Sequence, residues 1–230
     1  MDTITQLQHA LEHLSIGERE IIADWLQELT EAQLPGHAVA EPRSSYAAVQ
    51  PPFMTVDEYL EFEEKSPVRH EYVNGAIYAM NGVSVAHARI ARELVMAIGG
   101  HLRGGPCELF STDLKLQIRS DADEVFYYPD MMVACQRDDW GRNYVRNPKL
   151  VAEILSPSTQ HIDRREKAMT YRHIASLEEY VLLAQDDHNI SVQRRAENWR
   201  PQSYCGPEGT VEFRSIGLSI PLAQIYDGTL

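Results

Sequence analysis

The segment Leu150–Leu155 constrains the fold more than any other part of the sequence. It reads Leu-Val-Ala-Glu-Ile-Leu, so an extended strand here would be apolar on both faces apart from Glu153. Such a strand is typical of the centre of a sheet that is covered on both sides. A carboxylate in that position is costly unless it has a partner. The sequence therefore predicts a central strand that carries a paired or functional acid.

A second acid stands at the start of another strand-like segment, residues 130–135. Carboxylate oxygens are the ligands that Mg²⁺ and Mn²⁺ prefer in proteins, and a backbone carbonyl is also acceptable. We therefore expect Asp130 and Glu153 to meet around such a cation, with the carbonyl oxygen of Ile154 as a further candidate ligand. Lys167, on a helix expected over about 160–175, is the candidate for stabilising charge on a phosphate.

Each of these residues also has a plain structural interpretation. Asp130 would then accept hydrogen bonds from nearby amides at a strand start, and Glu153 would form a salt bridge with an arginine. Lys167 would point to water, as lysines on helices usually do. Tyr171 and Ile174, at i+4 and i+7, favour an inward direction for Lys167 instead.

Three further polar residues are weaker candidates. Glu71 lies in an expected hairpin and is either a surface acid or an outer metal ligand that binds through water. Asp113 has the same two interpretations, and His87 is expected on a helix surface.

The rest of the pattern predicts an α/β domain with a mixed sheet flanked by helices. Thr55-x-x-Glu58 is a capping box that marks a helix start. Asn74-Gly75 predicts a type I′ turn inside a hairpin at 69–80. Ser158 or Thr159 is expected to cap the helix at 160–175. The other expected elements are a helix at 84–102, a half-buried strand at 114–119, a loop at 136–149, strands at 180–184, 190–194, 199–204 and 211–213, and a short helix begun by Pro221.

The N-terminal part has a different character. Residues 1–35 carry two apolar helical stripes and predict a helical appendage too small to bury its own core. Residues 36–52 are rich in proline and predict a linker, and residues 53–230 form the main domain. The appendage is expected to cover part of that domain or to join two copies, which makes a homodimer the expected assembly.

Charge is unevenly distributed. The formal net charge is −13, of which residues 1–71 contribute −10 (14 acidic against 4 basic) and the remaining residues −3 (20 against 17). Residues 72–230 are thus close to neutral, which is compatible with a local arginine patch that contacts DNA phosphates. The residues expected to form it are Arg142, Arg146, Arg164, Arg165 and Arg172.

Other features bear on the environment of the protein. No apolar run is long enough to span a membrane, and the first residues lack the pattern of a signal peptide. Cys107, Cys135 and Cys205 are isolated, odd in number and without zinc-site spacing, which fits a reducing cytoplasm.

Together, Pro129-Asp130, Glu153-Ile154-Leu155 and Lys167 resemble the motif of the PD-(D/E)XK nuclease superfamily. The segments around them, such as Arg69–Gly75 and Val151–Thr159, resemble its Uma-two type of restriction-endonuclease-like proteins, over about residues 53–228. The resemblance implies that Asp130 and Glu153 bind Mg²⁺ or Mn²⁺ and that Glu71 is an accessory acid. The superfamily lysine position holds Leu155 here, so the resemblance implies that Lys167 has taken over that role.

Three functions therefore remain open from the sequence. The first is a metal-dependent endonuclease that hydrolyses DNA phosphodiester bonds. The second is a non-catalytic DNA-binding or regulatory module that retains the nuclease fold. In the third, residues 1–35 make the protein a dimerising interaction partner, with nuclease activity secondary.

The appendage leads to a test. A chain that begins at Phe53 should change its oligomeric state or bind DNA more tightly than the full chain, because an apolar and acidic segment has been removed. Light scattering and DNA titration measure the two effects. If both mass and affinity stay the same, the appendage has neither role.

Overall fold

The computed structural model describes residues 53–80, 82–111, 113–120, 123–136, 141, 143–157 and 160–229. The expected appendage, the linker and the Ser158 or Thr159 cap lie outside these residues. The helices are α3 (Val56–Lys65), α4 (Val85–Leu102), α5 (Gln160–Ile162), α6 (Ala168–Arg172) and α7 (Leu222–Ile225), with a π-helical turn η2 (Asp163–Lys167) between α5 and α6 and two 3-10 turns, η3 (Arg195–Glu197) and η4 (Arg214–Ile216).

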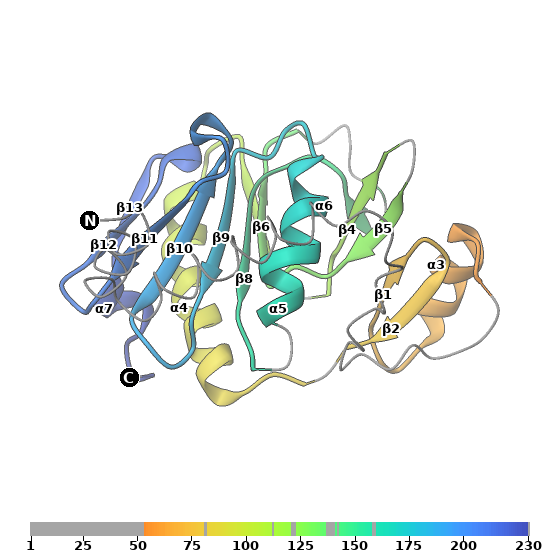
Figure 1. The fold of residues 1–230 in the computed structure, drawn as a ribbon, viewed down its shortest axis with the longest axis horizontal. Helices are drawn as coiled ribbons and strands as arrows, with labels where there is room; N and C mark the ends of the chain where they lie inside the picture. Colours follow the sequence, from red (N-terminus) through yellow and green to blue (C-terminus); the bar gives the residue numbers. More distant parts are fainter. Residues whose placement is uncertain are drawn as a thin grey trace, which may run out of the picture. The chain divides into compact units, whose positions relative to one another are not determined.

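The largest sheet in the described part of the chain has six strands in the order β11-β10-β9-β8-β6-β3 (Figure 1). Strand β8 pairs antiparallel with β6 and parallel with β9, so the sheet is mixed and β8 lies inside it. The expected central strand is confirmed. The bounds are β3 (Glu108–Ser111), β6 (Met131–Ala134), β8 (Pro148–Ile154), β9 (Glu179–Leu183), β10 (Asn189–Arg194) and β11 (Pro201–Cys205).

Helices cover both faces of this sheet, as the two-sided apolar character of β8 requires (Figure 1). On one face, Ile90 and Leu94 of α4 belong to a core cluster with Leu150 and Ala152 of β8. On the other face, Tyr171 of α6 packs in a second cluster that includes alternate residues of β8 such as Val151. Glu153 has the strand parity of Val151, so it faces the side of η2 and α6.

A second sheet has five strands in the order β2-β1-β5-β4-β7. Its hairpin turns at Asn74 and Gly75, whose φ angles of 49° and 98° are both positive, which confirms the type I′ prediction. The predicted capping box of α3 is also confirmed, because Thr55 and Glu58 exchange both hydrogen bonds. The bounds are β1 (His70–Val73), β2 (Ala76–Ala79), β4 (Lys115–Arg119), β5 (Glu124–Tyr127) and β7 (Tyr144–Val145), and a separate hairpin joins β12 (Thr210–Phe213) to β13 (Leu218–Pro221).

Two local predictions were wrong. The expected loop at 136–149 contains β7 and the start of β8. The strand β4 was expected to be half-buried, but Lys115 and Gln117 are also buried. The reason is that β4 lies between β5 and β7, and the Lys115 side chain packs against Tyr128, with Nζ 3.4 Å from the phenol oxygen.

The cysteines also differ from expectation, because Cys107 and Cys135 form a disulfide. Strands β3 and β6 pair with Glu108 opposite Ala134, and the same register extended by one residue places the two cysteines face to face. Edge strand β3 was not predicted, so their meeting had no signal in the sequence. The disulfide removes the cysteine argument for a reducing compartment. Among the described residues, no helix is long and apolar enough to cross a membrane.

The disulfide closes a loop with a sequence separation of 28 residues. Chain-entropy reasoning gives a contribution of about 3–4 kcal/mol to the free energy of unfolding for such a loop. Cys107→Ser and reduction by dithiothreitol should therefore lower the melting temperature to a similar extent. Cys205→Ser is the control, since this exposed cysteine is outside the disulfide. A melting temperature that is insensitive to both treatments would contradict this linkage.

Candidate active site

Strand register brings the two predicted acids together. The β6–β8 pairs include Met131 with Ala152, and continuing this antiparallel register by one residue sets Asp130 opposite Glu153. Two hydrogen bonds lock the arrangement. The Ile154 amide donates to Asp130 Oδ2 at 2.7 Å, and the Asp130 amide donates to Glu153 Oε2 at 3.2 Å. The expected hydrogen bond from a backbone amide to Asp130 is thus present, and it also orients the carboxylate.

Glu153 is held from the opposite side by the helix that follows. The Tyr171 hydroxyl donates to Glu153 Oε1 at 2.7 Å, and Lys167 Nζ lies 3.4 Å from the same oxygen. Glu153 is buried, and its ionic partner is this lysine and not an arginine. Tyr171 was considered only as a packing residue in the sequence, and the structure adds a polar role for its hydroxyl.

Lys167 points inward, as its spacing to Tyr171 and Ile174 predicted. Its side chain is only 6% exposed and its Nζ contacts three carboxylates: Glu71 at 3.0 Å, Asp163 at 3.3 Å and Glu153 at 3.4 Å. Burial alone would lower the pKa of Lys167, but these carboxylates outweigh burial and hold the pKa well above its ordinary value. Lys167 is therefore a permanent cation at neutral pH.

The lysine and Asp163 both come from the π-helical turn η2. Single π turns inside helices often occur at functional sites, because the wider turn shifts the side chains that it carries. Residues 163, 167 and 171 are spaced by four, and all three are buried on the side that faces Glu153. This i, i+4, i+8 pattern is the signal by which the sequence could have identified Asp163, which we did not single out.

Glu71 reaches the site from β1 and is buried, so the surface interpretation was wrong for this acid. Its Oε1 contacts Lys167 and accepts a hydrogen bond from the Tyr128 amide at 3.4 Å. Burial raises the pKa of Glu71, against the opposing effect of Lys167. Burial likewise raises the pKa of Glu153 to about 8, with Lys167 opposing the rise and Asp163 and Asp130 adding to it. Ionised, the three acids around Lys167 would place three negative charges beside one positive charge.

His87 was expected on a helix surface, and this expectation was wrong. The side chain is 11% exposed, and Nε2 lies 3.0 Å from Asp130 Oδ1. It comes from the first turn of α4, whose start is capped by Ser84. The sequence gave no signal for this contact, because Asp130 is distant from His87 in the chain. Asp113 lies away from the cluster and pairs with the half-exposed Arg69 at 3.1 Å.

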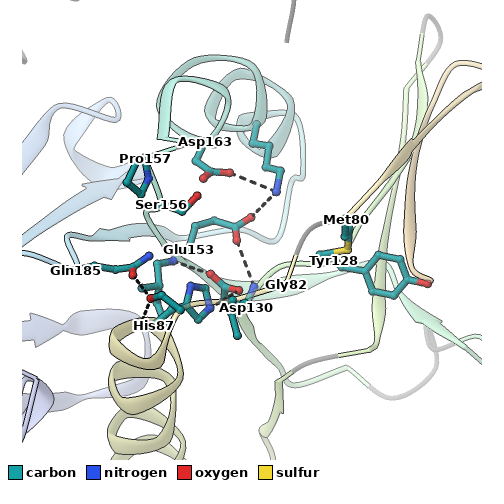
Figure 2. Close-up of a pocket in the computed structure, with 14 residues that line it drawn as sticks. Met80, Gly82, His87, Tyr128, Asp130, Glu153, Ser156, Pro157, Asp163 and Gln185 are labelled. Carbon is teal, nitrogen blue, oxygen red and sulfur yellow. Dashed lines mark hydrogen bonds and ion pairs between the residues drawn. The ribbon is translucent and has the colours of Figure 1, made fainter. Parts of the chain in front are cut away.

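His87, Asp130, Glu153 and Asp163 line one cavity of about 190 Å³ (Figure 2). In the close-up, Asp130 and Glu153 face each other, Asp163 lies beyond Glu153, and His87 and Gln185 form the opposite wall. The Asp130 side chain is 22% exposed, so the pair is reached from solvent at the Asp130 end. Lys167 and Ile154 also line the cavity, whereas Glu71 contacts Lys167 without being one of the lining residues.

The donor set can be tested against a divalent cation. Within the residues that the structure describes, no group of three or more His, Cys, Asp or Glu side chains is arranged to hold a metal. Mg²⁺, however, is usually held by one or two carboxylates and keeps several waters. Asp130 and Glu153 supply two carboxylates beside an open cavity, and a cation there would offset their excess negative charge. The residues therefore fit Mg²⁺ or Mn²⁺ bound largely through water, and the Ile154 carbonyl stays a predicted ligand.

The predicted arginines are dispersed. Arg164 and Arg165 are half-buried on η2, next to the residues that line the cavity. Arg146 is exposed, donates to Gln117 and stacks on Tyr144. Arg172 donates to Gln193 from the last residue of α6. Arg142 lies outside the described residues, and DNA contact by all five stays a prediction.

Comparison with known proteins adds independent information. The model of a family described as "Uma2: Putative restriction endonuclease" matches residues 56–223. "Uncharacterized protein slr1290" of Synechocystis sp. (strain ATCC 27184 / PCC 6803 / Kazusa) is 36% identical over 180 residues, which cover 77% of this chain and 93% of that protein. "Uncharacterized protein sll1609" of the same strain is 30% identical over 165 residues, which cover 70% and 92%.

A solved structure supports the fold. The crystal structure of a "putative nuclease belonging to DUF820" from Anabaena variabilis ATCC 29413 has a TM-score of 0.63 and 19% sequence identity, and covers 77% of this chain and 99% of that chain. At this identity the likeness shows the fold alone. The predicted α/β class, with mixed sheets flanked by helices, is confirmed.

The raised pKa of Glu153 gives a pH test in EDTA. Its pKa in the folded protein, about 8, exceeds its ordinary value of 4.5. The stability that the protonated form contributes is thus fully present below about pH 4.5 and is lost as pH rises through 8. Glu153→Gln mimics the protonated form. The melting temperature of the variant minus that of the unmodified protein should therefore be larger at about pH 9 than at about pH 5.5.

Glu61→Gln is the matched control. Glu61 is exposed and pairs with Lys65, and its pKa is lowered, mainly by its hydrogen bond from that lysine. Its ionisation is complete in the tested window, so the effect of this substitution should not change with pH. If the melting-temperature difference changed equally with pH in both variants, the raised pKa could not be assigned to Glu153.

Proposed function

The chain belongs to the Uma2 family, whose description reads "Putative restriction endonuclease", and from this premise we propose that it is a metal-dependent endonuclease that hydrolyses DNA phosphodiester bonds. The family supports a nuclease-like hydrolase in general. The observation that carries the finer proposal is the convergence of Asp130, Glu153 and Lys167 on one cavity that opens to solvent. Two carboxylates that could hold a metal ion and a buried cation that could stabilise charge on a phosphate suit phosphodiester hydrolysis.

Asp130 and Glu153 would hold the ion, which is Mg²⁺ or Mn²⁺ in this proposal. The chemistry that such an ion supplies when bound is activation of water and neutralisation of charge on the phosphate. The protein fixes both carboxylates before anything binds. His87 and the Ile154 amide hold the two oxygens of Asp130, and Tyr171 holds one oxygen of Glu153. Fixed ligands do not need to be reorganised during the reaction.

Lys167 would donate to the phosphate as negative charge develops in the transition state. Its high pKa keeps it protonated, so it acts as an electrostatic donor and not as a base. Glu71 and Asp163 would position the ammonium through their ion pairs with it, at 3.0 Å and 3.3 Å. In this role Glu71 is a positioning residue for the lysine, which replaces the expectation of an outer metal ligand.

One observation favours the second candidate, a DNA-binding module without catalysis. All four carboxylate oxygens of Asp130 and Glu153 already interact with groups of the protein. A cation must therefore displace or share some of these contacts, whereas a pure binding module would keep them. Metal titration separates the two functions.

Substitutions test the roles of the three central residues. Asp130→Asn and Glu153→Gln keep size but remove the charge that holds a hard cation, so each should weaken Mg²⁺ binding in calorimetry and abolish plasmid nicking. Lys167→Ala leaves both ligands, so metal binding should persist while cleavage falls by about 10²–10³-fold.

Stability must be measured alongside, because Lys167→Ala leaves buried carboxylates without a cation and should cost about 3–5 kcal/mol of unfolding free energy. Lys167→Arg keeps the charge with a different donor geometry and should also cut slowly. Lys65→Ala, an exposed lysine on α3, is the control. Normal cleavage by the Lys167 variants would remove this lysine from the mechanism, and normal metal binding by the acid variants would mean that the site is misplaced.

A further inference from the structure

A second, larger groove adjoins the candidate active site. It has a volume of about 500 Å³, and much of its lining is apolar, from Pro67, Val68, Met80, Ala88 and Ala91. Val68 is 46% exposed and Val83, on the same rim, is 63% exposed. Large apolar side chains gathered in the open beside a catalytic cavity generally mark a binding surface.

The groove is continuous with the catalytic cavity. The two share a wall, and the residues that line both are Met80, Gly82, Val83, His87, Tyr128 and Asp130. A molecule held at Asp130 can therefore extend directly into the groove. Whatever enters it is the part of the substrate next to the reacting phosphate.

The chemistry of the groove lining indicates which part of a DNA substrate the groove can bind. Aliphatic side chains have nothing to offer a phosphate, whereas the flat faces of a nucleobase are apolar and pack well between such side chains. Arg69 and Asp113, paired at 3.1 Å on the groove wall, supply donors and acceptors for the edge of a base. In duplex DNA the base faces are covered by stacking, so only an unpaired base can enter.

We propose that this groove binds the unpaired nucleobase next to the scissile phosphate, so that the substrate is single-stranded or locally unpaired DNA. This inference rests on the proposed function for the position of the phosphate. It adds strandedness, which the catalytic residues themselves do not determine.

Binding without cleavage tests the groove directly. The full-length Glu153→Gln protein is titrated, with fluorescence anisotropy as the readout, against a labelled single strand, the same sequence as a duplex, and the same strand with abasic tetrahydrofuran nucleotides. The abasic strand keeps the phosphates and lacks the bases. The single strand should bind at least about tenfold more tightly than either of the others, as expected for the loss of a base contact.

A groove-filling variant supplies the structural control. Ala88 is exposed on α4 and lines the groove, so Ala88→Trp occupies the groove without entering the core. It should abolish the preference for the single strand. Met96→Trp, at a 55% exposed position of the same helix that does not line the groove, should keep it. Circular dichroism melts verify that both variants fold.

The outcomes separate the two proposals. Equal affinity for the single strand and the abasic strand, or for the single strand and the duplex, would overturn the base-binding groove. So would a change in sedimenting mass caused by Ala88→Trp alone, since a second copy would then occupy the groove. Suppose that the unmodified protein with Mg²⁺ cuts none of these DNAs while the preference for the single strand, and its loss in Ala88→Trp, are still observed. In that case the nuclease proposal fails and the groove assignment stands.

Discussion

The ion cluster around Lys167 is the interaction on which the candidate site depends. One ammonium contacts carboxylates from β1, β8 and η2, so it ties together two sheets and the helix between them. Such a cluster is poor evidence for stability, because desolvation of buried charges offsets most of their attraction. The cluster matters because it positions the elements that carry its members. Removing Lys167 would leave buried carboxylates without a cation, so this one side chain fixes the relative placement of the three elements.

The central strand shows how sequence and site are linked. Strand β8 is apolar on both faces because α4 and α6 cover it, and this pattern was legible in the sequence. The same pattern made Glu153 conspicuous as a polar residue in an apolar run. Local periodicity was sufficient to place Glu153 in a buried strand and to direct Lys167 inward, through its spacing to Tyr171 and Ile174. The meeting of Glu153 with Asp130 was a hypothesis about a shared cation, and the β6–β8 register shows that the two acids do lie together.

Contacts between distant elements were beyond such reasoning. His87 meets Asp130 only because the start of α4 is brought beside the start of β6, and Glu71 meets Lys167 only because two sheets converge. The disulfide likewise depends on an edge strand, β3, that has no marked alternation in sequence. A periodic pattern reports the environment of a residue along one element, and partners across elements require the topology. Patterns also misjudge polar residues inside a sheet, as Lys115 on β4 shows.

The charge state of the cavity connects its stability with its proposed chemistry. With Asp130, Glu153 and Asp163 close together, burial already raises the pKa of Glu153 to about 8, so the site without a cation is partly protonated at neutral pH. A divalent cation that binds Asp130 and Glu153 must release that proton, so its affinity has to rise with pH. Lys167, in contrast, keeps its charge throughout. In the proposed function the site would thus separate a group that exchanges a proton for a metal from a group that stays cationic. The opening of the site at Asp130 places both groups beside the apolar groove.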